Sequence, residues 1–174
     1  MLQKYSRYRV MQEFFDFPRK GFQIREISRR INLAQVSVIN HLKALQKEGL
    51  VVKEKKGIYP TFHANTNNEN YKTLKKQNLV QRIHESELIS FIDRNLKPNC
   101  IVLFGSGARG EDTETSDIDL FVQAKEVQMD LGKYENLLKR KINLLFEPET
   151  KGLSKELLNN IINGQVIYGY LKVL

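Results

Sequence analysis

The sequence has a single cysteine and no long apolar run, and each absence excludes a class of protein. Cys100 alone excludes an intramolecular disulfide and any metal centre built from cysteines, and we expect it in the core. No apolar stretch approaches the roughly 18 residues that a membrane helix needs. Gln3, Lys4 and Arg7 also interrupt the N-terminus, where a signal peptide would carry its apolar segment. We therefore expect a cytoplasmic globular protein without membrane contact.

Negative charge is scarce in the front half of the chain. Residues 1–78 carry 16 lysines and arginines against 6 acidic residues, whereas residues 79–174 carry 12 against 14. This segregation predicts a front part that binds a polyanion and a back part with a different role. A chain of 174 residues is long enough for two small domains, each with its own core.

Three segments of the front half have apolar residues at helical spacing, and a strand-like stretch follows them. The helical segments are residues 2–16, 23–31 and 34–47; Pro18 ends the first, and Gly49 caps the third. Residues 50–62 indicate two short strands around a basic turn. Three helices followed by a hairpin predict a winged helix-turn-helix domain over residues 1–65.

Residues 38–51 resemble the recognition helix and wing entry of the winged-helix repressors of bacteria and archaea. When the apolar stripe of such a helix turns inward, its polar side chains meet base edges, while wing lysines meet phosphates. We expect contacts to double-stranded DNA from Gln35, Ser37, Asn40, His41, Lys43, Lys53, Lys55 and Lys56. Three alternatives stay open: His41 as a half-buried packing residue, the lysines as a solvated turn, and the domain as a protein-docking module.

The most loop-like stretch runs from Asn65 to Asn70 and marks the domain boundary. We assign residues 66–87 to a helical linker and residues 88–174 to a second domain. The first part of the linker is equally consistent with a dimer arm. Because winged-helix regulators commonly dimerise to match two half-sites, we expect a homodimer.

A glycine turn and two aspartates dominate the second domain. Residues 100–104 form an apolar run typical of a buried strand, and Gly105 and Ser106 follow directly. Asp117 and Asp119 alternate with apolar residues, so both carboxylates share one face of a strand and repel each other. Mg²⁺ or Mn²⁺ would relieve that repulsion, and substrate phosphates would complete its ligands. The pattern predicts a site for a nucleoside triphosphate.

Residues 104–122 closely resemble the DNA polymerase β-like nucleotidyltransferase superfamily, in particular its minimal branch, whose signature is Gly-Ser, a variable turn and Asp-x-Asp. The resemblance implies that Gly105 and Ser106 hold phosphates and that Asp117 and Asp119 are catalytic metal ligands. It also places Arg109 near the phosphates, although an ion pair of Arg109 with Glu111 or Asp112 is the alternative. The chain departs from the family pattern at Gly107, where a basic residue is more usual.

The same resemblance implies a third carboxylate on a later strand, where it activates the attacking hydroxyl. A helix over about residues 127–140 leads into the candidate strand, 141–147, and the family's aspartate falls on Asn143. An amide oxygen can bind a metal, but it does not usefully accept a proton. Glu147 lies roughly 13 Å further along an extended strand, too far to replace it. We therefore expect binding of nucleotide and metal with weakened catalysis.

These observations predict an α+β protein with a winged helix-turn-helix domain, a helical linker and a small mixed-sheet domain, which a short helix and a strand near residues 166–170 close. Our first hypothesis is a DNA-binding transcription regulator that carries a nucleotide- and Mg²⁺-binding nucleotidyltransferase domain. The second is an active enzyme that moves a nucleoside monophosphate to a hydroxyl of a protein, an RNA or a small molecule. The third hypothesis follows from relatives of the minimal branch that act as antitoxins: the domain would bind and restrain a partner protein.

Overall fold

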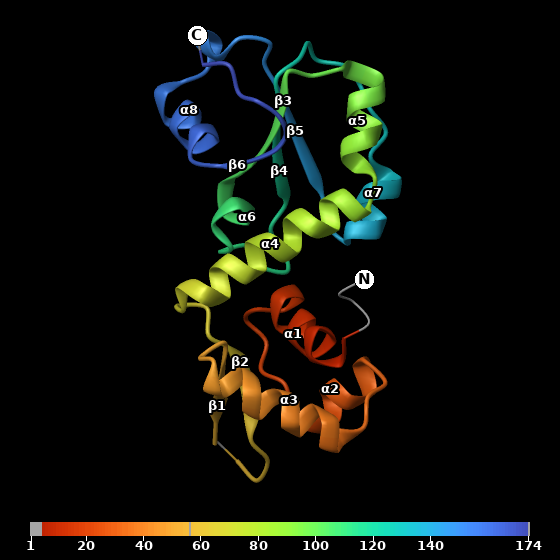
Figure 1. Cartoon of the computed structure of the whole chain (residues 1–174), viewed down its shortest axis with the longest axis vertical. Helices are drawn as coiled ribbons and strands as arrows, with labels where there is room; N and C mark the ends of the chain where they lie inside the picture. The colour runs from red at the N-terminus through yellow and green to blue at the C-terminus, as the bar shows by residue number, and fades with distance from the viewer. Residues whose placement is uncertain (1–4, 56, 174) are drawn as a thin grey trace. The chain divides into compact units, whose positions relative to one another are not determined.

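The computed structural model describes residues 5–55 and 57–173 and has the expected α+β class (Figure 1). The chain divides into two compact units, residues 1–72 and 73–174, which we call unit 1 and unit 2. The finer division into residues 1–65, 66–87 and 88–174 stays a prediction. Within the described ranges, none of the helices combines the length and the apolar character that crossing a bilayer demands.

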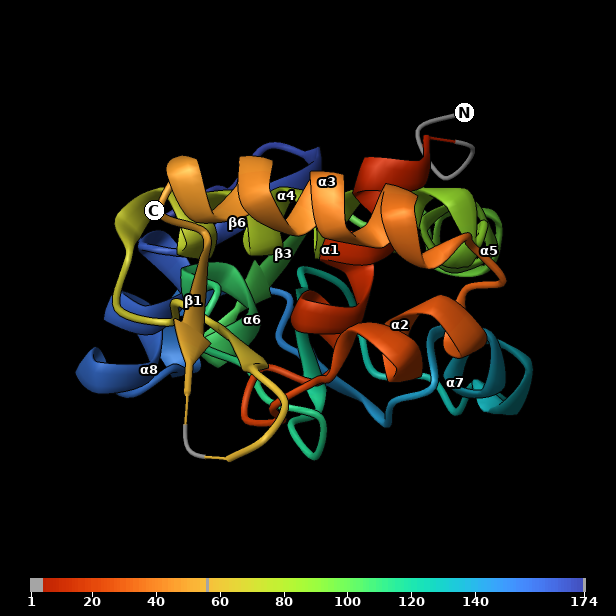
Figure 2. The same ribbon diagram turned by 90° about the horizontal axis from the view of Figure 1, so that it is seen from below.

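Unit 1 contains three helices followed by a hairpin. The helices are α1 (Ser6–Asp16), α2 (Ile24–Arg30) and α3 (Gln35–Lys47), and the strands are β1 (Val51–Glu54) and β2 (Thr61–Ala64). The strands pair antiparallel, and Phe22 extends the sheet through two 2.8 Å backbone hydrogen bonds with Phe62. α3 packs against α1 and α2 (Figure 2). This order of elements is the one that the sequence predicts.

The core of unit 1 gathers the apolar stripes of the three helices. Phe14, Ile27 and Val38 are each fully buried. Tyr71 also belongs to this core: its side chain is fully buried, and its hydroxyl donates a 2.8 Å hydrogen bond to the carbonyl of Phe14. The apolar residues that recur at helical spacing are therefore the ones that are buried, because each helix turns its apolar face toward this core.

Unit 2 is built on a four-stranded mixed sheet. Its strands are β3 (Cys100–Phe104), β4 (Ile118–Val122), β5 (Ile142–Phe146) and β6 (Gln165–Gly169), in the order β5-β4-β3-β6. β3 runs antiparallel to β4 and β6, and β4 runs parallel to β5. The helices are α4 (Glu69–Glu85), which begins in unit 1, α5 (Leu88–Leu96), α6 (Gly105–Arg109), α7 (Gly132–Leu138) and α8 (Lys155–Ile162); a 3₁₀ turn, η2, covers Thr150–Gly152.

Both faces of this sheet are covered by helices. Leu103 and Leu120 pack with residues of α4, α5 and α7, whereas Val102 and Phe121 pack with Ile161 of α8. Figure 1 shows α5 and α7 on one side of the strands and α8 on the other. Since side chains alternate along a strand, Asp119 belongs to the α8 face. Cys100 is fully buried on that face, as the sequence predicts.

Two local predictions need correction. The helix expected over about residues 127–140 is shorter, because Asp130 accepts a 3.0 Å hydrogen bond from the backbone N–H of Gly132 and forms a turn before α7 begins. The glycine turn after β3 is in fact the five-residue helix α6. Gly105 and Gly110 flank its core with φ of +69° and +68°, values that glycine adopts without strain.

Candidate nucleotide and metal site

The backbone of Gly105 lies directly against the carboxylate of Asp119. A Cβ atom built on Gly105 would lie 2.7 Å from Asp119 Oδ2, closer than real side chains approach. The register of β3 and β4 explains this contact, because Phe104 is paired with Asp119. The Gly-Ser segment and the second aspartate, 14 residues apart in the sequence, therefore lie side by side.

Asp117, Asp119 and Asn143 converge at one end of the β4–β5 pair. Asp119 lies opposite Asn143 in the parallel register, and Asp117 directly precedes β4. The Asn143 amide nitrogen donates hydrogen bonds of 3.2 Å to Asp117 Oδ2 and 3.1 Å to Asp119 Oδ1. Ionised carboxylates only accept hydrogen bonds, so the nitrogen of the amide, and not its oxygen, faces them. The two aspartates thus point to one place, as strand alternation predicts.

These side chains have the chemistry of a Mg²⁺ site. The carboxylates of Asp117 and Asp119 both accept a hydrogen bond from the Asn143 amide nitrogen, so the space between the two carboxylates favours a positively charged group. Such hard oxygen donors, completed by water and phosphate oxygens, are what Mg²⁺ prefers. Asp117 and Asn143 are exposed and Asp119 is half-buried, which leaves the site open to a substrate. Across the residues that the structure describes, no three His, Cys, Asp or Glu side chains form a metal-binding group, and the group here consists of two carboxylates and one amide.

Ser106 and Arg109 both lie on α6. Ser106 is half-buried, and its carbonyl accepts a 3.0 Å hydrogen bond from the N–H of Glu111. Arg109 Nε forms a 2.9 Å ion pair with Glu111, and both side chains are about half exposed. Of the two partners weighed for Arg109, the structure therefore has Glu111. Its expected contact with phosphates stays a prediction.

Gly107 departs from the family pattern for a packing reason. It is buried, and a Cβ atom there would lie 2.9 Å from Leu79 Cδ2 of α4 and 3.5 Å from Leu103 Cδ1. A long basic side chain at this position would have to displace the side chain of Leu79. The close packing of α6 on α4 thus accounts for the missing basic residue.

Glu147 does not join the site. It follows the last residue of β5, whereas Asn143 lies near the first. A Cβ atom on Gly152 would lie 3.2 Å from the Glu147 carboxyl carbon, so this side chain lies against the η2 turn. Glu147 is thus at the opposite end of the strand and does not take the place of the acid that is missing at position 143.

The residues expected to contact DNA lie on α3 and the hairpin of unit 1. Gln35, Asn40, Lys43, Lys53 and Lys55 are exposed, and Ser37 and His41 are half-buried, while Lys56 lies outside the described residues. His41 Nε2 lies 2.7 Å from Ser6 Oγ. Burial, with a smaller contribution from the Arg7 guanidinium, lowers the pKa of His41. These contacts favour the packing role for His41.

Sequence reasoning missed two groups of residues. In unit 1, a cavity of about 240 Å³ is lined by α2, the start of α3 and the end of the hairpin loop, and the Arg25 guanidinium lies 5.7 Å from the ring centroid of Tyr59 there. In unit 2, Lys75 and Arg140 meet the buried Asp112. The members of each group are distant in sequence and share no motif, so only the fold brings them together.

Comparison with known proteins agrees with the geometry of unit 2. Residues 86–170 match the family described as polymerase beta, nucleotidyltransferase, and this range contains α6, both aspartates and Asn143. A protein of Methanocaldococcus jannaschii, described as "Putative protein adenylyltransferase", is 40% identical over 80 residues. That similarity covers 42% of this chain and 88% of the archaeal protein.

Proposed function

Because the chain belongs to the polymerase β nucleotidyltransferase family, we propose that unit 2 binds Mg²⁺ and ATP at Asp117 and Asp119 and transfers AMP only weakly. The observation that carries the proposal is the Asn143 amide, which bridges the two carboxylates where a third acid would stand. The adenylyl group in the description of the archaeal relative supports ATP as the nucleotide and a protein as the acceptor class.

The proposal gives each residue a defined role. Asp117 and Asp119 would hold the metal ion, which, when bound, neutralises phosphate charge and favours in-line attack at the α-phosphate. The Ser106 hydroxyl and the backbone of Gly105 would donate hydrogen bonds to the remaining phosphates. Because Gly105 contacts Asp119, groups that bind phosphate and groups that bind metal lie side by side.

Asn143 limits the chemistry in this account. The attacking hydroxyl must lose a proton, and an amide does not accept one, so the expected rate is lower by roughly 10² to 10⁴-fold. The amide nitrogen also holds the carboxylates together by donating to both. To serve as a ligand of the cation, Asn143 would have to present its amide oxygen, because its amide nitrogen has no lone pair to offer.

Calorimetric titration of the full chain with ATP, with and without Mg²⁺, tests this proposal. We expect Mg²⁺-dependent binding that Asp119→Asn removes and that Glu126→Gln, an exposed acid outside the site, leaves intact. Incubation with α-labelled ATP and a lysate then measures transfer. If the wild type binds no ATP in the presence of Mg²⁺, the proposal fails.

A second function is favoured by the charge of unit 1. Residues 1–72 carry 14 lysines and arginines against 6 acidic residues, whereas residues 73–174 carry 14 of each, so all of the net charge of +8 lies in unit 1. We propose that unit 1 is a winged helix-turn-helix domain that binds double-stranded DNA, with α3 as its recognition helix. The chain would then be a transcription regulator whose activity depends on whether ATP is bound at the nucleotide site of unit 2.

A mobility-shift assay with random duplex DNA at several salt concentrations tests the second function. The double variant Lys53→Ala/Lys55→Ala should weaken binding and reduce the salt slope by about 2 if each lysine contacts one phosphate. The matched control is Lys151→Ala/Lys155→Ala, two exposed lysines of unit 2. Absence of DNA binding, together with one specific co-purifying protein, would favour the antitoxin-like alternative. Sedimentation of the same samples tests the expected homodimer.

A further inference from the structure

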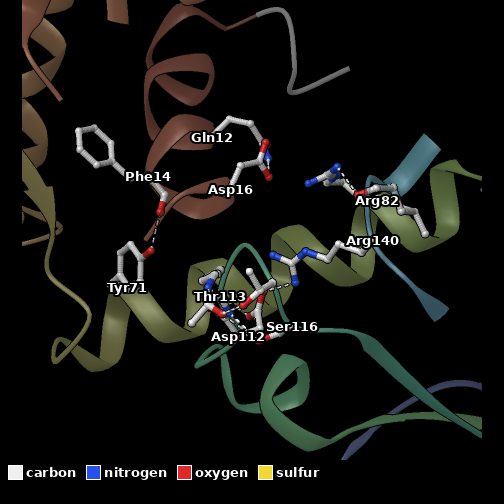
Figure 3. A network of polar contacts seen from close by, with 12 residues as sticks. Gln12, Phe14, Asp16, Tyr71, Arg82, Asp112, Thr113, Ser116 and Arg140 are labelled. Atoms are coloured by element: carbon white, nitrogen blue, oxygen red, sulfur yellow. Dashed lines mark hydrogen bonds and ion pairs between the residues drawn. The ribbon is translucent and has the colours of Figure 1, made fainter. Parts of the chain in front are cut away.

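Three buried charged side chains of unit 2 meet outside the proposed metal site. Asp112 and Lys75 are each 2% exposed, and the side chain of Arg140 is 8% exposed. Lys75 Nζ lies 3.3 Å from Asp112 Oδ1 and also donates to the Asp112 backbone carbonyl. Arg140 Nη1 donates to Asp112 Oδ2, as Figure 3 shows. We call these three residues the Asp112 cluster.

A short braced segment leads from this cluster to the first aspartate of the site. Asp112 comes five residues before Asp117. Between them, the Thr113 N–H donates a 2.9 Å hydrogen bond to Ser116 Oγ, and the Ser116 N–H donates a 3.2 Å bond to the Thr113 carbonyl. These two bonds close a turn, and Asp112 and Asp117 directly flank it.

A second short segment leads from the same cluster to Asn143. Arg140 comes three residues before Asn143 and directly before Lys141. The Lys141 carbonyl accepts a 2.8 Å hydrogen bond from the N–H of Ile118, next to the first paired residues of β4 and β5. The ion pair between Asp112 and Arg140 therefore joins the two segments that deliver Asp117 and Asn143 to the site.

The cluster is costly to bury, which argues for more than packing. Three charges leave water, and two cations share one carboxylate. Burial lowers the pKa of Lys75, while the Asp112 carboxylate opposes this shift. Apolar side chains of similar volume often stabilise a fold as well as a buried ion cluster does, but an ion cluster tolerates fewer arrangements of its members.

We propose that Lys75, Asp112 and Arg140 are positioning residues that fix Asp117 relative to Asn143 and thereby set the metal affinity of the site. None of the three contacts the carboxylate pair; each acts through the short segments described above. The effect on metal affinity rests on the proposed function, because it requires that the site binds a metal ion. The effect on the position of Asn143 can be measured without any ligand.

The test uses the full chain and two readouts at a temperature well below unfolding. The first is the NMR signal of the Asn143 side-chain amide, and the second is the affinity for MnCl₂ alone, by calorimetry. Arg140→Lys keeps the charge but loses the fork geometry. We expect it to shift the Asn143 signal and to weaken Mn²⁺ binding by about tenfold. This is the lower end of the loss seen when a direct hydrogen-bond partner of a metal ligand is removed, because the cluster acts through an intervening segment. Lys125→Ala, which removes an exposed cation beyond the other end of β4, should change neither readout.

Variants of Asp112 and of the whole cluster provide a second test. Asp112→Asn should act as Arg140→Lys does; if it fails to fold, the apolar triple variant Lys75→Met/Asp112→Leu/Arg140→Met takes its place. A merely structural role would lower the melting temperatures of these variants but leave the Asn143 signal unchanged and the Mn²⁺ affinity within twofold of the wild type. That result would overturn the inference. A wild type that binds no Mn²⁺ would refute the proposed function, while the Asn143 signal would still decide whether the cluster positions the site.

Discussion

Asn143 lies opposite Asp119 in the parallel pairing of β5 with β4, and its amide nitrogen donates a 3.1 Å hydrogen bond to Asp119 Oδ1. The same nitrogen reaches Asp117 Oδ2 at 3.2 Å. One neutral side chain thus offsets part of the repulsion between two acids. The amide therefore helps the pair to remain together without a cation, whereas a third carboxylate in that place would add to the repulsion.

Asn143→Asp should make the stability of the chain depend on metal. A third carboxylate in contact with the other two costs about 1 kcal/mol at an exposed site, or roughly 2–4 °C in melting temperature for a chain of this size. We expect a lower melting temperature in EDTA and recovery with Mg²⁺. Scanning calorimetry measures both, and Asn136→Asp on the exposed face of α7 is the control. A variant as stable as the wild type in EDTA would argue against close contact of these side chains.

Gly105→Ala should impair both the fold and the site. At φ +69° an alanine costs about 1–2 kcal/mol, and its Cβ would lie 2.7 Å from Asp119 Oδ2. The displaced carboxylate should also weaken Mg²⁺-dependent ATP binding. Urea unfolding and calorimetric titration check the two effects. Gly57→Ala, where the new Cβ has nothing within 4 Å, should be neutral in both.

Gly107→Arg, which restores the residue type more usual in the family, should destabilise this chain. The new side chain would overlap Leu79 at 2.9 Å, and overpacking of this kind typically costs about 1–3 kcal/mol. Unfolding in urea gives the free energy difference. Leu79→Ala should cost less in the Gly107→Arg background than in the wild type, because it vacates the space that the new side chain needs. A fully stable single variant would contradict the packing explanation for Gly107.

Glu135 should stabilise the start of β5 in a way that depends on pH. The Ile142 N–H and the Lys141 ammonium group donate to this carboxylate and lower its pKa below 4.5. A depressed folded-state pKa means that the stabilisation is present above pH 4.5 and is lost as the pH falls through the folded-state value. Glu135→Gln should therefore be less stable than the wild type at neutral pH, and the gap should shrink toward pH 3. A gap independent of pH would contradict this.

Local patterns predicted much of this molecule. Alternation along residues 117–122 predicted that Asp117 and Asp119 share a face, since the other face of β4 must be buried. The apolar periodicity of residues 34–47 likewise predicted the buried face of α3. Both predictions depend on neighbours in the sequence, whose side-chain directions follow from the secondary structure alone.

The remaining features depend on contacts between distant residues. Lys75 and Arg140 lie 37 and 28 positions from Asp112, and no pattern of residue types links them. The sequence predicted a glycine turn after β3, where the structure has the short helix α6. Gly105 and Gly110, at the two ends of this helix, both adopt a left-handed conformation. The lack of a side chain at Gly107 was visible in the sequence, but its cause, the contact with Leu79, was not.

Transfer of label from α-labelled ATP by the wild type and by Asn143→Asp, both at saturating Mg²⁺ and ATP, decides whether Asn143 limits the chemistry of unit 2. Both proteins should bind Mg²⁺ and ATP, and the variant should transfer at least about tenfold more AMP, because a restored base typically contributes roughly 10² to 10⁴-fold. A wild type that already transfers as fast as the variant, or a variant that binds ATP but gains nothing, would contradict this role of Asn143.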